Sequence, residues 1–549
     1  MKLLIVGGVA GGASAAARAR RLSESAEIIV FERGPDVSFA NCGLPYYVGG
    51  TIADRDKLLV TTSERLKSRF RLDVRTSSNV EKINRAAKTI VVREQASGRV
   101  YEESYDKLIL APGAAPMKPP IPGVDLPGIL TLRNLQDVDR IKAAVDAGVR
   151  HVVVVGGGFI GLELVENFVH NGIPTTVVQS QDQLLSPYDK EMTAPLEQVL
   201  KEKGVTLLLN NTAEGFEQQS EGLMIHLKSG QHLTADLVVL GIGVRPENQL
   251  AIDAGLHVGP RGGIQVNDTL LTSDPDIYAV GDAIEVKDFG SGEPTQVPLA
   301  GPANRQGRIA AENVFGRSSR YRGTQGTAII GFFGKTIAMT GASEKTLRFT
   351  NRSFRKIYVH PAHHAGYYPG AQPMTIKLLF DPKDGLILGA QAVGGEGVDK
   401  RIDVLAVAIQ ARMTVFDLEE MELAYAPQFG SAKDPVNMAG FVASGLIRGD
   451  HPQTDVESLL ATASDQRPYL IDVRTPQEFS QGAIPGAVNI PVDDLRERLK
   501  ELPANKPIAV YCQVGQRGYL ATRILLQSGF TDVVNIGGGY KTYKLFSPG

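Results

Sequence analysis

Two stretches of the chain share one order of apolar, glycine-rich and helix-forming residues. The first, KLLIVGGVAGGASAAARARRL followed by EIIVFER, lies at the N-terminus, and the second, HVVVVGGGFIGLELVENFVHNGIPTTVVQ, begins about 150 residues later. An apolar run, a glycine turn, a helical pattern and a second apolar run predict a β-strand, a helix and another strand. The pattern therefore predicts two Rossmann-like dinucleotide-binding domains, one of them inserted in the other.

Beyond these two units the pattern changes twice. From about residue 323, apolar strands such as TIKLLFDPKDGLILGAQAVGG and the helical IDVLAVAIQARM predict an α+β domain with an antiparallel sheet. The polar stretch IRGDHPQTD predicts a linker, and short apolar strands after it predict a small α/β domain. The predicted boundaries are 1–111 with 247–322 for the first nucleotide-binding domain, 112–246 for the second, 323–447 for the α+β domain, 448–455 for the linker and 456–549 for the C-terminal α/β domain. We expect the strand-like segments 105–116 and 235–247 to cross between the two nucleotide-binding domains.

Net charge, the length of apolar runs and the number of cysteines exclude several classes of protein. A formal net charge of −2 gives no bulk basic field for nucleic acid. No apolar run approaches the roughly 20 residues that span a bilayer, and the apolar N-terminus breaks at glycines, as a first strand does and a signal peptide does not. Two cysteines about 470 positions apart do not make a disulfide framework. We therefore expect a cytoplasmic protein that binds no metal, membrane or nucleic acid.

The first glycine turn predicts a pyrophosphate site. Backbone N–H groups at the start of a helix, together with the helix dipole, favour an anion there. Glu32 ends the next strand, 20 residues after Gly12, where a carboxylate can accept hydrogen bonds from ribose hydroxyls. Val9 stands where the usual motif has its middle glycine, so the match is imperfect. The residues assigned to this site are Gly7, Gly8, Val9, Ala10, Gly11, Gly12, Glu32, Arg33 and Val80.

The second glycine turn carries the complete G-x-G-x-x-G pattern in Gly156, Gly158 and Gly161, after a strand and before a helix. The following strand ends at Gln179, where an acid that selects NAD is expected. A neutral amide can bind ribose without repelling a 2′-phosphate, and no Arg or Lys stands nearby in the sequence to attract one. We therefore expect NADH as the cosubstrate, with tolerance for NADPH.

Cys42, in SFANCGLPYY, is the first of two candidate reactive thiols. A lone redox cysteine cycles through a sulfenic acid, a mixed disulfide or a persulfide. This motif, with the N-terminal glycine turn and helix, closely resembles the coenzyme A-disulfide reductase family and its relatives, the NAD(P)H-dependent persulfide reductases and the single-cysteine NADH oxidases. The resemblance covers about residues 1–447. It implies FAD in the first nucleotide-binding domain, NAD(P)H in the second, and a homodimer joined through the α+β domain.

The same resemblance implies roles for residues near the flavin. In DPDIYAVGDAIE, Gly281 and Asp282 resemble the segment whose Asp contacts the ribityl chain, and Ala300 corresponds to a contact at the ring end. The alternative for the first pair is an ordinary turn after a strand. Glu163 corresponds to an acid near the nicotinamide and the flavin, although the helix dipole alone also favours an acid on a first helical turn.

Coenzyme A binds beside Cys42 under this resemblance. Arg18 and Arg21 are three apart on one helix face, where guanidinium groups can pair with phosphates; the alternative is a solvated basic face. The other residues assigned to this substrate are Ser38 and Asn41, for the pantetheine arm, and Lys67 and Arg71, for additional charge.

Two tyrosines complete the implied site. Tyr367, in HHAGYYPGA, and Tyr425, in ELAYAPQFGSAKDPVN, match tyrosines that the family brings from the partner subunit, where they act near the thiol as hydrogen-bond donors or acids. Read alone, either residue is typical of a half-buried surface tyrosine.

Cys512 is the second candidate thiol. Its loop CQVGQRG, between the strand PIAVY and a helix, looks like a rhodanese active loop, and the upstream IDVRTPQEFSQGAIPGAVNIPV is also rhodanese-like. Successive backbone N–H groups form an anion cradle in such a loop, and Arg517 adds positive charge that favours a thiolate. A phosphatase needs five residues between its Cys and Arg, whereas Gln513 to Gln516 supply four. We expect Asp472 and Arg474 to support the loop rather than to react.

These observations predict an FAD enzyme that passes electrons from NAD(P)H to Cys42, which reduces a sulfur–sulfur bond in coenzyme A persulfide, polysulfide or coenzyme A disulfide. Cys512 would accept sulfane sulfur and relay it to the first site. Two alternatives remain open. One is an NADH oxidase or peroxidase in which Cys42 becomes a sulfenic acid, and the other is a non-catalytic redox sensor whose tail binds a partner.

Overall fold

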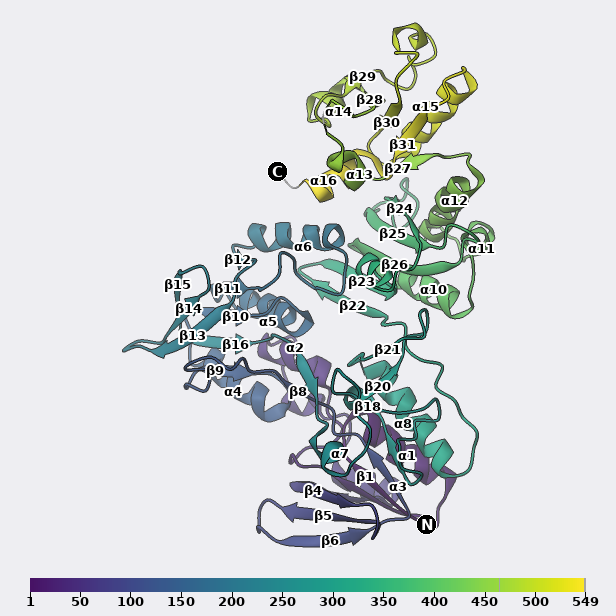
Figure 1. Ribbon diagram of the computed structural model, residues 1–549. Coiled ribbons are helices and arrows are strands. Elements are labelled where there is room, and N and C mark those ends of the chain that lie inside the picture. Colours follow the sequence, from purple (N-terminus) through teal and green to yellow (C-terminus); the bar gives the residue numbers. More distant parts are fainter. Residues whose placement is uncertain (464, 548–549) are drawn as a thin grey trace. The chain divides into compact units, whose positions relative to one another are not determined.

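The computed structural model describes residues 1–463 and 465–547, so three positions of the predicted C-terminal domain, 464, 548 and 549, lie outside the described residues. The chain forms two compact units. One comprises Met1–Leu185 with Leu200–Gly326, and the other comprises Ser186–Val199 with the chain from Thr327 onward. Each unit is described by itself (Figure 1).

The first unit contains a parallel sheet in the order β19-β7-β1-β2-β3. Its strands are β1 (Lys2–Val6), β2 (Glu27–Phe31), β3 (Asp73–Arg75), β7 (Lys107–Leu110) and β19 (Ile277–Ala279). Leu3, Leu4 and Ile5 of the central strand are fully buried, as expected for a parallel sheet covered on both faces.

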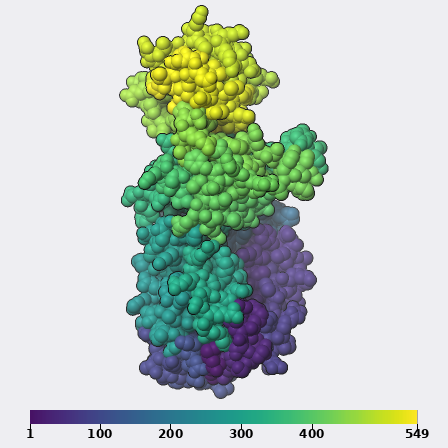
Figure 2. Space-filling model, turned by 90° about the vertical axis from the view of Figure 1, so that its right-hand side faces the viewer, coloured from purple at the N-terminus to yellow at the C-terminus, as the bar shows by residue number. Residues whose placement is uncertain are grey.

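Two helices far apart in the sequence cover this sheet together. Helix α1 (Ala10–Leu22) packs against α8 (Ala300–Val314), and a Cβ added at Gly307 would lie 2.1 Å from the Gly11 carbonyl oxygen. Figure 2 accordingly shows purple N-terminal surface beside teal surface from about 250 residues later. The first domain is therefore built from two separate stretches of chain.

A second parallel sheet, in the order β12-β11-β10-β16-β9, lies in the same unit. Its strands are β9 (Ile129–Thr131), β10 (Val152–Val155), β11 (Thr175–Val178), β12 (Thr206–Leu208) and β16 (Leu237–Leu240). The two predicted crossings between the sheets contain β8 (Ala114–Pro116) and β17 (Val244–Pro246), which pair with each other antiparallel.

Smaller elements complete the first unit. The helices are α2 (Leu44–Val48), α3 (Ser63–Phe70), α4 (Leu135–Asp146), α5 (Phe159–His170) and α7 (Gln249–Asp253). The additional strands are β4 (Ser78–Asn84), β5 (Thr89–Glu94), β6 (Val100–Ser104), β13 (Ala213–Gln218), β14 (Leu223–Leu227), β15 (His232–Ala235), β18 (Ile264–Gln265), β20 (Ile284–Lys287) and β21 (Pro294–Thr295). Helix α6 (Lys190–Glu202) begins in the stretch Ser186–Val199, which belongs to the second unit.

The second unit begins with the predicted α+β arrangement. Its antiparallel sheet has the order β22-β23-β26-β25-β24. The strands are β22 (Ala328–Phe332), β23 (Lys335–Gly341), β24 (Arg355–Val359), β25 (Met374–Phe380) and β26 (Ile387–Gly394). The helices are α9 (Glu344–Phe349), α10 (Val398–Gln410), α11 (Val415–Glu420) and α12 (Pro435–Arg448).

The same unit ends in a parallel sheet ordered β27-β31-β30-β28-β29. The strands are β27 (Gln453–Thr454), β28 (Tyr469–Asp472), β29 (Val488–Asn489), β30 (Ile508–Tyr511) and β31 (Val533–Ile536), and the helices are α13 (Val456–Ala461), α14 (Pro476–Ser480), α15 (Gln516–Gln527) and α16 (Gly539–Phe546). Strand β27 comes from the predicted linker and forms one edge of this sheet. Figure 2 shows the yellow surface of the C-terminal domain adjoining the green surface of the α+β domain.

The predicted α/β fold class, with two Rossmann-like domains, an α+β domain and a C-terminal α/β domain, is confirmed by these sheets. Among the described residues, no helix combines the length and apolar character needed to cross a membrane.

Candidate active site

The first glycine turn is sterically restricted to glycine at its two ends. Gly7 has φ +100°, and a Cβ there would lie 2.0 Å from the Ala111 carbonyl oxygen. A Cβ at Gly12 would lie 1.8 Å from the Gly7 carbonyl oxygen. Among the described residues, no side chain caps the start of α1, and its first turn contains no acid. The free N–H groups and the absent side chains fit the pyrophosphate of a dinucleotide.

Glu32 is oriented by the turn that it follows. Its Oε2 accepts a hydrogen bond from the Gly8 N–H at 2.8 Å, and its Oε1 accepts one from the Gly34 N–H at 2.9 Å. This carboxylate is therefore fixed beside the glycine turn, where ribose hydroxyls can reach it. Arg33 instead forms an ion pair with Glu247 at 2.6 Å. Val80 is buried in the core around the first sheet.

The segment containing Gly281 and Asp282 lies against the first glycine turn. A Cβ added at Gly11 would lie 3.0 Å from Val280 Cγ2 and 3.7 Å from the Gly281 nitrogen. Gly281 has φ +79° and donates its N–H to Gln306 Oε1 at 2.8 Å. Burial raises the pKa of Asp282. Two motifs almost 270 positions apart are thus brought together, while Ala300 opens α8 as an exposed residue.

The second glycine turn repeats the geometry of the first. Gly156 has φ +115°, and a Cβ there would lie 2.3 Å from the Gly241 carbonyl oxygen. A Cβ at Gly161 would lie 2.1 Å from the Gly156 carbonyl oxygen. Gly158 precedes α5, whose start is not capped by a side chain of the described residues. This turn also fits a dinucleotide pyrophosphate.

Gln179 occupies the position that Glu32 has in the first domain. Its Oε1 accepts a hydrogen bond from the Gly157 N–H at 3.0 Å, and its Nε2 donates to the Gln183 carbonyl at 3.0 Å. The amide is buried, and both ends have backbone partners. Two hydrogen bonds therefore fix which end of the amide faces the glycine turn.

Cys42 lies in a single 3₁₀ turn, Asn41–Gly43, directly before α2. The residue is exposed, but desolvation of its sulfur raises the pKa of the thiol, and the charges of Glu163 and Asp282 raise it further. Residues predicted separately for the two cofactors therefore act on the same sulfur atom. Burial, with the charge of Glu166, raises the pKa of Glu163 to about 7.

The turn that carries Cys42 is held by close packing. Helix α2 packs on α5, and a Cβ added at Gly49 would lie 1.8 Å from Asn167 Oδ1. Ser38 has φ +48° and donates its N–H to the Gly8 carbonyl at 2.9 Å. Asn41 Nδ2 donates to the Arg133 carbonyl at 3.0 Å. The predicted pantetheine residues therefore connect the thiol turn to the first glycine turn and to Arg133.

The basic residues assigned to coenzyme A have unequal surroundings. Arg18 Nη2 forms an ion pair with Glu312 Oε1 at 2.5 Å, and its Nε is buried without a hydrogen-bond partner among the described residues. Arg21, Lys67 and Arg71 are exposed. Arg18 is therefore already neutralised by a carboxylate, whereas the other three present their charge to solvent.

Three residues near these sites were not identified from the sequence. Arg20 is buried and donates five hydrogen bonds to backbone carbonyls, which joins the end of α1 to the end of α3. Burial and the charge of Glu163 raise the pKa of Tyr46 to about 12. Arg133 forms an ion pair with Glu247 at 2.5 Å, and its charge lowers the pKa of Asp282 against the effect of burial. Position relative to the apolar face of α1 is the one sequence signal that separates Arg20 from Arg18 and Arg21.

In the second unit, Tyr367 and Tyr425 are brought together. Their hydroxyl oxygens lie 2.7 Å apart, and the side chains are 76% and 49% exposed. This hydrogen bond raises the pKa of Tyr367. The buried Arg401 connects the two loops that carry these tyrosines. It forms an ion pair with Asp434 and donates a hydrogen bond to the His363 carbonyl at 2.7 Å.

Cys512 follows strand β30 and is buried. The Gly515 N–H donates to its Sγ at 3.2 Å, and Gly515 has φ +99°. Arg517 makes two hydrogen bonds of 2.7 Å to Glu478, which raise its pKa, and the charge of Cys512 raises it further. Arg474 pairs with Asp472 at 2.6 Å and donates to Gln513 Oε1 at 3.2 Å. These contacts fit the expectation that Asp472 and Arg474 support the loop.

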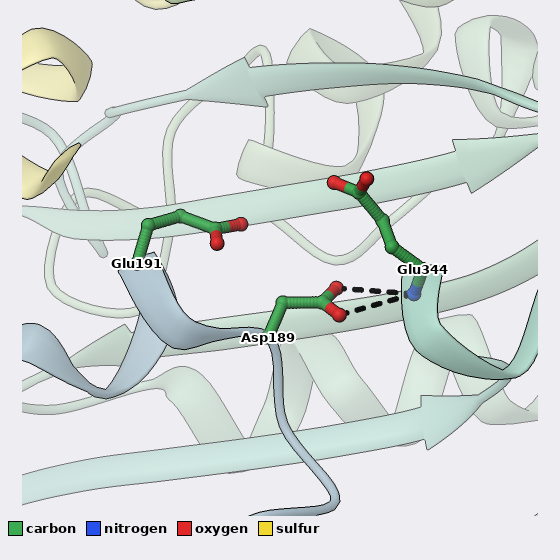
Figure 3. A group of neighbouring side chains, drawn as sticks. All are labelled: Asp189, Glu191 and Glu344. Carbon is green, nitrogen blue, oxygen red and sulfur yellow. Dashed lines mark hydrogen bonds between the residues drawn. The ribbon is translucent and has the colours of Figure 1, made fainter. Parts of the chain in front are cut away.

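A buried carboxylate group in the second unit has the spacing of a metal site. Figure 3 shows Asp189 and Glu191 near the start of α6 and Glu344 at the start of α9, with ligand oxygens within 4.8 Å of one another. The Nζ of Lys377 lies 2.7 Å from Asp189, 2.5 Å from Glu191 and 2.6 Å from Glu344. The ammonium of Lys377 therefore pairs with all three carboxylates, and Lys356 and Arg348 add further positive charge at Glu344.

Two linked dinucleotide folds, a single exposed thiol facing both, and an α+β domain define a nucleotide-dependent thiol–disulfide oxidoreductase. Residues 1–307 match the pyridine nucleotide-disulphide oxidoreductase family, and residues 327–435 match its dimerisation domain, so the chain belongs to this family. Residues 453–545 match the rhodanese-like domain. The predicted family, its enzyme class and the fused rhodanese-like domain are confirmed.

Individual relatives agree with this assignment. A coenzyme A disulfide reductase of Staphylococcus aureus (strain JH9) is 36% identical over 80% of this chain and 99% of its own. The reduced CoADR-RHD of Bacillus anthracis is 49% identical with a TM-score of 0.97, over 100% of this chain and 98% of its own. A NAD-dependent persulfide reductase from A. fulgidus is 35% identical with a TM-score of 0.92, over 99% of this chain and 100% of its own.

Proposed function

We propose that the chain uses NAD(P)H to reduce a sulfur–sulfur bond in coenzyme A persulfide, coenzyme A disulfide or a polysulfide. The observation that carries this proposal is the position of Cys42. Its turn leads into α2, which packs on α5 of the second dinucleotide domain, and Ser38 joins the same segment to the first glycine turn. The names of the relatives from S. aureus and A. fulgidus support the substrate classes.

The glycine turns at Gly7 and Gly156 would hold the pyrophosphates of FAD and NAD(P)H, respectively, and Glu32 and Gln179 would bind the adjacent riboses. FAD supplies two-electron transfer between the nicotinamide and sulfur. Gly281, Asp282 and Ala300 would hold the flavin, with Arg33 and Val80 in the same domain, and Glu163 would be close to the flavin and the nicotinamide.

Cys42 provides the nucleophile for the substrate. Its thiolate attacks the inner sulfur of coenzyme A persulfide, a Cys42–coenzyme A disulfide forms, and hydrosulfide leaves. Two electrons and protons then regenerate both thiols, so that one NAD(P)H and one proton convert the persulfide to coenzyme A and hydrogen sulfide. Ser38 and Asn41 orient the pantetheine arm. Arg21, Lys67 and Arg71 attract the phosphates, with Arg18 contributing if it leaves Glu312.

Tyr367 and Tyr425 act as a hydrogen-bonded pair near the thiol of the partner subunit in a homodimer. Their mutual hydrogen bond and high exposure support a role outside their own unit. In the C-terminal domain, Cys512 takes sulfane sulfur from a donor as a persulfide, Arg517 favours the anion, and the sulfur passes to coenzyme A.

The test is anaerobic. Enzyme and NADH are mixed in turn with coenzyme A persulfide, coenzyme A disulfide and a polysulfide, and NADH oxidation and sulfide are both measured. We expect turnover with at least one of them, with one sulfide for each NADH when the persulfide is reduced. Inactivity with all three, together with rapid NADH oxidation once oxygen is admitted, would instead identify an oxidase. The water-forming NADH oxidase of Lactobacillus brevis is 29% identical over 82% of this chain and 99% of its own, with a TM-score of 0.79.

A further inference from the structure

The first residues of α16 form backbone hydrogen bonds with the Cys512 loop. The Tyr540 N–H donates to the Cys512 carbonyl at 2.8 Å, and the Lys541 N–H donates to the Gln513 carbonyl at 2.9 Å. A Cβ added at Gly539 would lie 2.2 Å from the Cys512 carbonyl oxygen. These contacts hold two carbonyls of the loop, and within the same loop the Gly515 N–H donates to the Cys512 Sγ. The loop conformation therefore depends on where α16 begins.

The next residue of α16, Thr542, is bound by the α+β domain. Thr542 is fully buried, and its Oγ1 lies 2.7 Å from Nε2 of His360, the residue that follows β24. His360 Nδ1 lies 2.9 Å from Thr375 Oγ1 on the neighbouring strand β25. Burial lowers the pKa of His360 to about 3, so the imidazole is neutral and one of its nitrogens donates while the other accepts.

Neighbouring contacts show that this is a packed junction. A Cβ added at Gly538 would lie 2.0 Å from Thr542 Oγ1 and 2.8 Å from Tyr358 Cβ. The Tyr358 ring meets Phe546 of α16 edge-on, with centroids 6.3 Å apart. Lys356 forms an ion pair with Glu457 of α13. The position of α16 is therefore set by β24 as well as by its own domain.

We infer that His360 is a positioning residue for the Cys512 loop, acting through Thr542. The reductase dimerisation domain thereby sets the geometry of the sulfur-transfer loop, although it contributes no atom to that site. The inference rests on the sulfur-transfer role proposed for Cys512, but its geometric part does not.

The experiment uses the full chain carrying Cys42→Ser, so that Cys512 is the sole thiol. Thr542→Val removes the hydroxyl and keeps the shape, Thr542→Ser keeps the hydroxyl, and His360→Ala removes the imidazole. The matched control is Thr462→Val, because among the described residues the Thr462 hydroxyl donates to the Ser458 carbonyl of the adjacent helix α13. Two assays are used. One measures the rate of Cys512 alkylation by iodoacetamide, and the other measures kcat and KM for sulfur transfer from thiosulfate to a thiol.

We expect Thr542→Val and His360→Ala to lower kcat for sulfur transfer by about ten- to a hundredfold, since small displacements of reacting groups have effects of that size, and to change the alkylation rate. The double variant should lose no more than the more damaging single variant, because both act through one hydrogen bond. Thr542→Ser and Thr462→Val should resemble the parent.

Unchanged alkylation and kcat in Thr542→Val would overturn the inference, even if its melting temperature falls, because that result describes packing alone. If the parent transfers no sulfur from any sulfane donor, the proposed role of Cys512 fails, and the alkylation rates alone then decide whether His360 positions the loop.

Discussion

The two cysteines of the chain occupy opposite electrostatic surroundings. The exposed Cys42 faces Glu163 and Asp282, whose charges raise its pKa. The buried Cys512 faces the Gly515 N–H, and its charge in turn raises the pKa of Arg517. An anion at Cys512 is stabilised by groups of its own loop, whereas a thiolate at Cys42 needs stabilisation from what binds beside it. Under the roles proposed for the two cysteines, the surroundings of the thiol that stores sulfur stabilise an anion, and those of the thiol that receives electrons do not.

The largest effect is expected when each cysteine is replaced in turn and the two activities are measured separately. Cys42→Ser should lower NADH-dependent reduction of coenzyme A disulfide by at least about a thousandfold, as loss of a nucleophile does, and should leave sulfur transfer from thiosulfate unchanged. Cys512→Ser should do the reverse. Both activities are measured on both proteins, with the flavin spectrum as a control for folding. Loss of both activities in either variant would mean that the two thiols form one site.

A smaller effect is expected from the cation beside Cys512. Arg517→Gln should lower kcat for sulfur transfer by about ten- to a hundredfold, because it removes one charged donor from an anion site. Arg498→Gln is the matched control, since Arg498 also makes a two-bond pair with a glutamate, Glu501, outside the loop. Equal rates in the two variants would show that the loop N–H groups alone stabilise the anion.

Only the activity at Cys42 should depend on whether NADH or NADPH is the reductant. Gln179→Glu places a carboxylate where a 2′-phosphate would lie, so kcat/KM for NADPH should fall about tenfold more than that for NADH. Sulfur transfer at Cys512 should not change. Steady-state rates with both nucleotides measure this, and an equal loss with NADH and NADPH would place Gln179 away from the 2′ position.

The smallest effect concerns the charge near Cys42. In a Cys512→Ser background, Glu163→Gln should move the pH midpoint of Cys42 alkylation to lower pH. Glu163, with a pKa of about 7, is ionised where the thiol titrates, and its charge raises the thiol pKa, so its removal lowers it. Glu81→Gln, on the surface strand β4, serves as the control. A midpoint that stays or rises would remove Glu163 from the surroundings of the sulfur.

The sequence predicted the two dinucleotide folds because their glycine turns are local. Gly7 and Gly156 adopt backbone angles and close contacts that few other residues allow. The glycine motif in the sequence therefore predicts the geometry of the turn directly. The approach of Asp282 and Glu163 to Cys42 is not local. The family resemblance predicted only that each acid lies near the flavin, and their effect on the sulfur follows from the tertiary structure. Arg20, buried among carbonyls, and Arg18, paired with Glu312, differ in the sequence only by their position relative to the apolar face of α1, and their partners are set by tertiary packing.

The strand β27 has a practical consequence for dissection of the chain. Its two residues cover one side of β31, and just before them His451 Nε2 lies 2.8 Å from the buried Nδ2 of Asn535. A fragment cut at residue 456 would leave that border of the sheet with unpaired peptide groups, a template for self-association. A fragment starting before His451 would keep this edge of the sheet paired, and is the one to express when the rhodanese-like domain is studied in isolation.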